Sequence, residues 1–120
     1  MTKVLVVEDD FISMKLVFEI LTAYGIMVDG AENGKEAIKK IENELYDLIL
    51  MDIELPDMDG IETTRIIKSK SEYKDVPVIA LTAYAMKGDR ERFLEAGLDG
   101  YIAKPIHVTD FMERMKKYVG

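Results

Sequence analysis

The sequence contains no cysteine and no tryptophan, and only one histidine and three prolines among its 120 residues. Without cysteine the chain has no disulfide framework, no thiol nucleophile and no cysteine ligands for zinc or iron–sulfur clusters. The longest apolar runs, such as Val4–Val7 and Leu48–Met51, have four residues, which is too short to cross a bilayer. Charged residues crowd the amino terminus, unlike in a signal peptide. We therefore expect no membrane insertion, and the cytoplasm is the simplest location.

The chain has fewer basic residues than acidic ones. The chain has 16 Lys and Arg against 23 Asp and Glu, which gives a net charge of −7 at pH 7 with the histidine neutral. Such a surface repels nucleic-acid phosphates and anionic lipids, so we expect no direct nucleic-acid binding. The length, with 48% hydrophobic and 32% charged residues, suits one globular domain over residues 1–120.

Short apolar runs rich in branched residues alternate with longer amphipathic stretches, and this alternation predicts an α/β fold with a parallel sheet flanked by helices. We expect a (βα)5 arrangement. The predicted strands are 3–8, 26–31, 46–52, 77–82 and 99–103. Three of them are continuous apolar runs, typical of strands covered on both faces. The 26–31 segment is weaker and is predicted to be an edge strand.

Helices are predicted near 11–24, from the cap Asn33 onward, near 84–97 and after His107. Gly25 would end the first helix, and His107 is expected to be a surface or capping residue. The apolar positions predicted to face the core are Leu16, Val17, Ile20, Leu21 and Tyr24, then Ala37, Ile38, Ile41 and Leu45, and finally Val108, Phe111, Met112, Met115 and Val119.

The first half of the predicted 84–97 helix, Met86–Arg92, is polar nearly all round and contains Gly88. Glycine weakens a helix by about 1 kcal/mol relative to alanine. We expect this helix to be loosely held. It is either simply exposed or a segment whose position shifts at little cost.

Polar residues follow the predicted strands where they end. Glu8 and Asp9 follow the first strand, Asp52 and Thr82 end the third and fourth, and Lys104 follows the fifth. The carboxyl ends of parallel strands meet at one edge of a sheet, where ligands bind. We therefore expect these side chains to share one crevice.

Three carboxylates in such a crevice repel one another, and either a shared proton or a bound cation would relieve the repulsion. With phosphate as the substrate, Mg²⁺ is the better solution because it prefers oxygen ligands. Asp52, at the end of a central strand, is the expected nucleophile, and Thr82 and Lys104 would hold oxygens of the transferring phosphoryl group.

The loop 53–60 would present a backbone carbonyl to the metal. Pro56 and Gly60 stand at turn-forming positions in it, which would fix its shape. We expect Glu54, Asp57 and Asp59 to serve mainly as solvating charges.

Four segments in order and spacing resemble a known family: VLVVEDD at 4–10, DLILMDIELPDMDG at 47–60, PVIALTA at 77–83 and AGLDGYIAKPI at 96–106. Together they resemble the response-regulator receiver domains of two-component signalling. The resemblance covers the whole chain. It implies a doubly wound, flavodoxin-like (CheY-like) five-stranded parallel sheet with strand order 2-1-3-4-5.

The resemblance further implies a phosphoacceptor switch that catalyses its own phosphorylation and dephosphorylation, rather than a conventional enzyme. Asp52 would accept a phosphoryl group from a phosphohistidine on a sensor histidine kinase or a histidine phosphotransfer protein. Thr82 and Lys104 would bind phosphoryl oxygens, and the peptide bond before Pro105 would be cis. The implied protein ligands of Mg²⁺ are Glu8, mostly through water, then Asp9, Asp52 and the backbone carbonyl of Glu54.

Tyr101 matches the aromatic switch position of the family, which turns inward when the hydroxyl of Thr82 moves toward the phosphoryl group. The alternative is an ordinary half-buried strand tyrosine. The change would reach the surface of the fourth helix, fifth strand and last helix, where a downstream protein target would dock. Glu54 and Tyr84 match positions that tune the lifetime of the acyl phosphate.

Three functions remain open from the sequence. The first is a stand-alone receiver, favoured by the Met1-Thr2-Lys3 start, or a receiver excised from a hybrid histidine kinase. The second is a haloacid-dehalogenase-like phosphohydrolase, because Asp52 and Glu54 match an Asp nucleophile with an acid two residues later. The third is a binding module that needs no phosphorylation, which the intact set of acids, threonine and lysine disfavours.

Overall fold

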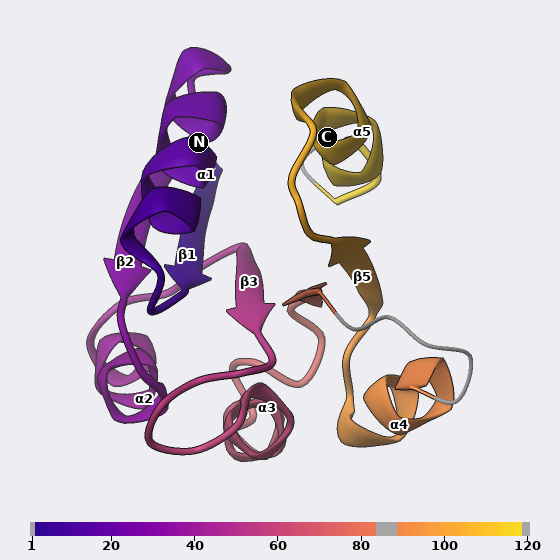
Figure 1. The fold of residues 1–120 in the computed structure, drawn as a ribbon. Coiled ribbons are helices and arrows are strands. Elements are labelled where there is room, and N and C mark those ends of the chain that lie inside the picture. The colour runs from indigo at the N-terminus through magenta and orange to yellow at the C-terminus, as the bar shows by residue number, and fades with distance from the viewer. Residues whose placement is uncertain (1, 84–88, 119–120) are drawn as a thin grey trace.

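A five-stranded parallel sheet forms the centre of the computed structural model, which describes residues 2–83 and 89–118 (Figure 1). The strand order is β2-β1-β3-β4-β5, as predicted. Each observed strand begins and ends within two residues of its predicted range. The strands are β1 (Lys3–Val7), β2 (Met27–Ala31), β3 (Leu48–Asp52), β4 (Val78–Thr82) and β5 (Gly100–Ala103).

The continuous apolar runs are the strands buried on both faces. All residues of β3 and β4 are buried, and so is β1 after Lys3. β2 lies at one edge and is only partly buried before Ala31, which confirms the weaker 26–31 segment as an edge strand. The hydrophobic pattern therefore reports the position of each strand in the sheet.

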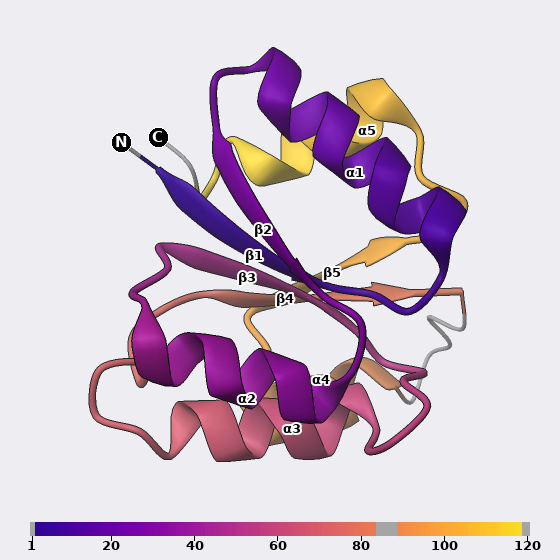
Figure 2. The same cartoon turned by 90° about the vertical axis from the view of Figure 1, so that its left-hand side faces the viewer.

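Helices cover both faces of the sheet (Figure 2). On one face lie α1 (Phe11–Ala23) and α5 (Val108–Met115), and on the other lie α2 (Gly34–Asn43), α3 (Gly60–Lys68) and α4 (Asp89–Ala96). Alternate residues of β1 accordingly enter two different cores, Val4 and Val6 on the α1 side, Leu5 and Val7 on the α2 side. Among the described helices, none is both long enough and apolar enough to span a membrane.

Most helix predictions hold. Asn33 caps α2 by accepting a hydrogen bond from the Glu36 backbone N–H at 2.8 Å, and Gly25 follows α1 with φ +77°. Three apolar residues at or near helix ends were predicted to face the core, and this prediction is wrong for them. Tyr24, Leu45 and Val108 are 59%, 71% and 49% exposed.

Those three side chains lie where a helix has ended or is just beginning. Tyr24 is the C-cap of α1, Leu45 follows the extended C-cap of α2, and Val108 is the first residue of α5. They therefore leave the face that covers the sheet. Tyr84, Val119 and the segment 84–88 of the predicted fourth helix lie outside the described residues.

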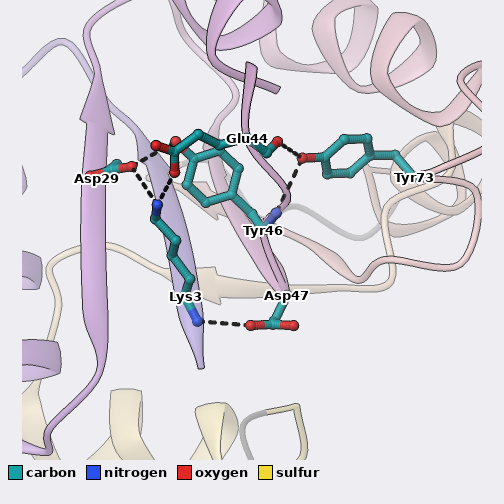
Figure 3. Close-up of polar contacts among 6 residues, drawn as sticks. All are labelled: Lys3, Asp29, Glu44, Tyr46, Asp47 and Tyr73. Carbon is teal, nitrogen blue, oxygen red and sulfur yellow. Dashed lines mark hydrogen bonds and ion pairs between the residues drawn. The ribbon is translucent and has the colours of Figure 1, made fainter. Parts of the chain in front are cut away.

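A polar network fastens the amino end of the sheet, opposite the end where the site residues are predicted (Figure 3). The Lys3 ammonium pairs with Asp29 of β2 at 3.6 Å and with Glu44, and it lies 5.5 Å from the centre of the Tyr46 ring. The Tyr46 hydroxyl donates to Asp29 at 2.7 Å. These contacts join β1 and β2 to the segment that leads into β3.

Tyr73 extends this network from the segment between α3 and β4. Its buried hydroxyl donates to the Glu44 carbonyl at 2.7 Å and accepts from the Tyr46 backbone N–H at 3.2 Å. One phenol thus satisfies two backbone groups at the entry to β3.

We predict that Tyr73→Phe lowers the free energy of unfolding by about 1–3 kcal/mol, because it leaves a backbone donor and an acceptor without their partner. Urea denaturation followed by circular dichroism measures the change. Tyr24→Phe, at an exposed position, is the control and should stay within about 0.5 kcal/mol of the parent. Equal stability of the two variants would show that the Tyr73 hydroxyl contributes nothing.

Candidate functional site

The predicted site residues meet at the carboxyl edge of the sheet. Glu8 directly follows β1, and its backbone N–H donates to the Ala31 carbonyl at 2.9 Å. Asp52 ends β3, and Thr82 ends β4. The Lys104 backbone N–H donates to the Thr82 carbonyl at 2.9 Å, which extends the β4–β5 pairing by one residue. Adjacent parallel strands thereby hold these four side chains near one another.

Three carboxylates form the acidic cluster expected from the sequence. Glu8, Asp9 and Asp52 each offer a carboxylate oxygen within 4.8 Å of the others. Glu8 is 1% exposed and Asp52 is 2% exposed, whereas Asp9 faces solvent. The Lys104 ammonium lies 2.5 Å from Glu8 Oε1 and 3.5 Å from Asp52 Oδ2.

The charges in this crevice perturb one another. Burial, and after it the neighbouring Asp52 carboxylate, raise the pKa of Glu8 to about 7 against the opposing effect of Lys104. Burial also raises the pKa of Asp52. For Lys104 burial acts to lower the pKa, but the nearby Glu8 and Asp52 carboxylates outweigh burial and raise it. Below about pH 7 the metal-free cluster therefore retains a proton on the Glu8–Asp52 pair.

The donor set fits a hard divalent cation. Glu8, Asp9 and Asp52 offer carboxylate oxygens, which Mg²⁺ prefers, and the exposed Asp9 leaves room for water ligands. Glu8 Oε1 is buried and accepts no hydrogen bond of good geometry from the described residues, although Lys104 lies beside it. A cation would take the place of the proton that otherwise relieves the repulsion.

The loop after Asp52 is closed tightly at its base. The Gly60 backbone N–H donates to the Ile53 carbonyl at 2.9 Å, and a Cβ at position 60 would lie 2.2 Å from the Asp52 carbonyl oxygen. Glycine is therefore required at position 60 for this close approach. The glycine was visible in the sequence as a turn residue, but its contact with Asp52 was not.

The expectation that Asp57 and Asp59 are merely solvating charges is wrong. Asp59 caps α3 by accepting from the Glu62 backbone N–H at 2.8 Å. Asp57 accepts from two backbone N–H groups at the start of α2. The local Asp-x-x-Glu pattern at 59–62 could have revealed the first role, whereas no local signal reveals the second.

Glu54 faces the site with both its backbone and its side chain. Its backbone N–H donates to Asp52 Oδ1 at 3.1 Å. The hydroxyl of the buried Thr82 lies 3.4 Å from Glu54 Oε1, to which it donates a long hydrogen bond. Glu54 is therefore in contact with the expected nucleophile and with the expected phosphoryl-binding hydroxyl.

Residues 101–107 carry the remaining predictions that fall on described residues. The Lys104–Pro105 peptide bond is cis, as expected. Tyr101 is partly buried, and the Arg114 guanidinium lies 5.7 Å from its ring centre. His107 is exposed at the N-cap position of α5 and makes no side-chain capping bond there, which agrees with the predicted surface position.

Comparison with known proteins identifies relatives along the whole chain. The family model of the response regulator receiver domain matches residues 4–116. The chain is 45% identical over 121 residues to the polar-differentiation response regulator DivK of Brucella ovis, a match that covers 100% of this chain and 98% of that protein.

Solved structures have the same fold. The receiver domain of a sensor histidine kinase from Pseudomonas aeruginosa, with a magnesium ion coordinated in its active-site cleft, matches with a TM-score of 0.90 at 36% identity, covering 99% of this chain and 98% of that one. The chemotaxis protein CheY4 of Vibrio cholerae matches with a TM-score of 0.95 at 27% identity, covering 99% of both chains. The predicted CheY-like fold is confirmed.

We predict that the stability of the metal-free protein relative to Glu8→Gln falls as the pH rises from about 4.5 to 7. The folded protein binds the Glu8 proton more tightly than the unfolded chain, because the pKa rises from 4.5 to about 7 on folding. The stabilisation is therefore complete below pH 4.5 and is lost as the pH rises through 7. Its upper limit is about 3 kcal/mol.

Thermal or urea unfolding in the presence of a chelator, at several values of pH between 4.5 and 8, measures this difference. Glu8→Gln retains the side-chain volume and is the neutral reference at every pH. A stability difference independent of pH would contradict the elevated pKa of Glu8.

Proposed function

The chain belongs to the response regulator receiver domain family, and from this premise we propose that residues 1–120 form a single receiver domain that undergoes Mg²⁺-dependent phosphorylation on Asp52. Receiver domains are phosphoacceptor switches of two-component signalling and not conventional enzymes. The observation that carries the proposal is the buried Asp52 carboxylate, which lies beside Glu8 and Asp9 and is paired with the Lys104 ammonium. Family membership removes the haloacid-dehalogenase alternative.

In the proposed reaction a carboxylate oxygen of Asp52 attacks the phosphorus of a phosphohistidine on a sensor histidine kinase or histidine phosphotransfer protein. The P–N bond breaks, an acyl phosphate P–O bond forms, and the imidazole leaves. Glu8, Asp9, Asp52 and the backbone carbonyl of Glu54 would hold Mg²⁺, which supplies the positive charge that lets an anionic carboxylate meet an anionic phosphoryl group.

Lys104 and Thr82 would bind the phosphoryl oxygens. Lys104 Nζ already lies 3.5 Å from Asp52 Oδ2, so a phosphoryl group on Asp52 would come within its reach. Thr82 has a hydroxyl that contacts Glu54 over a long 3.4 Å. Because that contact is weak, we infer that Thr82 exchanges it for a phosphoryl oxygen when Asp52 is modified.

The movement of Thr82 would pass to Tyr101, which lies on the adjacent strand two residues before Ala103, the register partner of Thr82. Tyr101 lines a hollow of about 320 Å³ together with residues of α4 and α5, among them Leu94 and Arg114. A reorientation of the Tyr101 ring would reshape this hollow, and we propose that a downstream protein target binds there and distinguishes the two shapes. Glu54 and Tyr84 are the residues proposed to tune the acyl-phosphate lifetime, and the cytoplasm is the proposed location.

We predict that incubation with acetyl phosphate and Mg²⁺ adds one phosphoryl group to the parent chain. Asp52→Asn should show no gain because its amide is not a nucleophile, and a chelator should prevent the gain on the parent. Intact-protein mass spectrometry measures the product.

Asp75→Asn is the matched control, because Asp75 is exposed and precedes β4 at the opposite end of the sheet. This variant should gain the phosphoryl group like the parent. Phosphorylation that persists in Asp52→Asn would refute Asp52 as the acceptor. No gain on the folded parent, either from acetyl phosphate or from a phosphorylated histidine kinase, would favour a phosphorylation-independent binding module.

We predict that millimolar Mg²⁺ raises the melting temperature of the parent, because the ion binds the folded acidic cluster and not the unfolded chain. An ion at ten times its dissociation constant contributes about 1.4 kcal/mol, which corresponds to several degrees for a domain of this size. Asp9→Asn should fold normally, since Asp9 is exposed, and should lose most of the shift. Equal shifts in both proteins would place the ion elsewhere.

A further inference from the structure

The side chain of Asp57 connects the loop after β3 to the start of α2, 23 residues away in the sequence. Its Oδ1 accepts a hydrogen bond from the Gly34 backbone N–H at 2.9 Å, and its Oδ2 accepts from the Lys35 backbone N–H at 3.0 Å. These are the first two residues of α2, and the first N–H groups of a helix have no partner within the helix. Asp57 therefore caps α2 although it is distant in the sequence. Asn33, which directly precedes the helix, accepts from the Glu36 backbone N–H.

Close packing at Gly34 shows independently that this loop rests on α2. A Cβ at position 34 would lie 2.5 Å from Met58 Cγ and 2.6 Å from Thr63 Oγ1. Only a residue without a side chain allows Met58 to approach the helix start this closely. Asp57 and Met58 thus bring the outer part of the loop against α2 by two kinds of contact.

The same loop carries Glu54, three residues before Asp57. At the base of the loop the Gly60 N–H bonds to Ile53, which fixes the two points where the loop leaves and rejoins the fold. Between these points Leu55 packs against the core, and the contacts of Asp57 and Met58 with α2 hold the outer part of the loop. Any tilt would move the Glu54 backbone, whose N–H donates to Asp52 Oδ1 at 3.1 Å.

We propose that Asp57 is a positioning residue for the phosphorylation site: its two hydrogen bonds to the first turn of α2 hold the 53–59 loop so that Glu54 keeps its backbone contact with Asp52. This inference rests on the proposed function, in which Glu54 also provides the backbone carbonyl for Mg²⁺. Asp57 itself accepts its hydrogen bonds from α2 and acts on the site through the loop.

A carboxylate is well suited to this role. It can accept one hydrogen bond on each oxygen, and its negative charge is favourable at the amino end of a helix. Burial acts against ionisation, but the backbone N–H groups of Gly34 and Lys35 outweigh it and hold the pKa of Asp57 below its usual range. The Asp57 carboxyl therefore loses its proton at a lower pH than an ordinary aspartate does.

Two alanine substitutions separate positioning from simple helix capping. Asp57→Ala and Asn33→Ala each remove a side-chain cap from the first turn of α2, so their costs in stability should be comparable. Of the two substitutions, only Asp57→Ala removes a contact between the loop and α2. Two readouts are compared: the dissociation constant of Mg²⁺ by titration calorimetry, and amide hydrogen exchange at Glu54 in the metal-free protein.

We expect Asp57→Ala to weaken Mg²⁺ binding by about tenfold, as for other residues that orient metal ligands, and to accelerate exchange of the Glu54 amide. Asn33→Ala should change neither by more than about twofold and should accelerate exchange at Glu36. Asp57→Asn, which keeps one acceptor oxygen, should fall between Asp57→Ala and the parent. It also carries the comparison if Asp57→Ala does not fold.

Equal effects of Asp57→Ala and Asn33→Ala on Mg²⁺ binding would overturn the proposal, because capping alone would then explain them. Unchanged Glu54 exchange in Asp57→Ala would overturn it as well. A parent protein that binds no Mg²⁺ would refute the proposed function, and the positioning role with it, before any variant is compared. Failure of the proposed function and failure of the positioning role of Asp57 therefore give different results.

Discussion

The ion pair between Lys104 and the buried carboxylates of Glu8 and Asp52 is the interaction on which the candidate site depends. Two buried acids side by side would be costly if both were ionised, and the structure relieves this cost with one ammonium at 2.5 and 3.5 Å and with a raised pKa on Glu8. The relief is incomplete. Below about pH 7 a proton remains that a divalent cation could displace, so the proposed binding of Mg²⁺ and the stability of the metal-free fold would be linked through the same carboxylates.

The fold supplies this cluster without any special local structure. Parallel strands end at one edge, and β1, β3 and β4 each end in or next to a polar residue. The loops then contact these polar side chains and help to position them. Gly60 brings the base of the 53–60 loop against Asp52, and Glu54 in that loop contacts both Asp52 and Thr82. A chemical change on Asp52 would therefore reach Thr82 through Glu54.

The sequence predicted what repeats along the chain and failed where distant segments meet. Burial on both faces makes a strand continuously apolar, so β1, β3 and β4 were recognisable, and their polar ends located the site. Leu45 and Tyr24 were misplaced because helical periodicity does not report where a helix stops. The role of Asp57 was missed because its partners, Gly34 and Lys35, belong to another helix start. A loop aspartate has the same local sequence whether it faces solvent or a remote backbone.

The two ends of the sheet differ in how firmly they are held. At the amino end, Lys3, Tyr46 and Tyr73 connect the strands through contacts in which each polar group already has a partner within the protein (Figure 3). At the carboxyl end, Glu8 Oε1 has no hydrogen bond of good geometry among the described residues. Satisfied networks resist rearrangement, whereas partly satisfied groups gain from a new ligand. A phosphoryl group and a cation would therefore rearrange the carboxyl end while the amino end keeps the strands in register, which confines the conformational change to the loops and helices that a partner can contact.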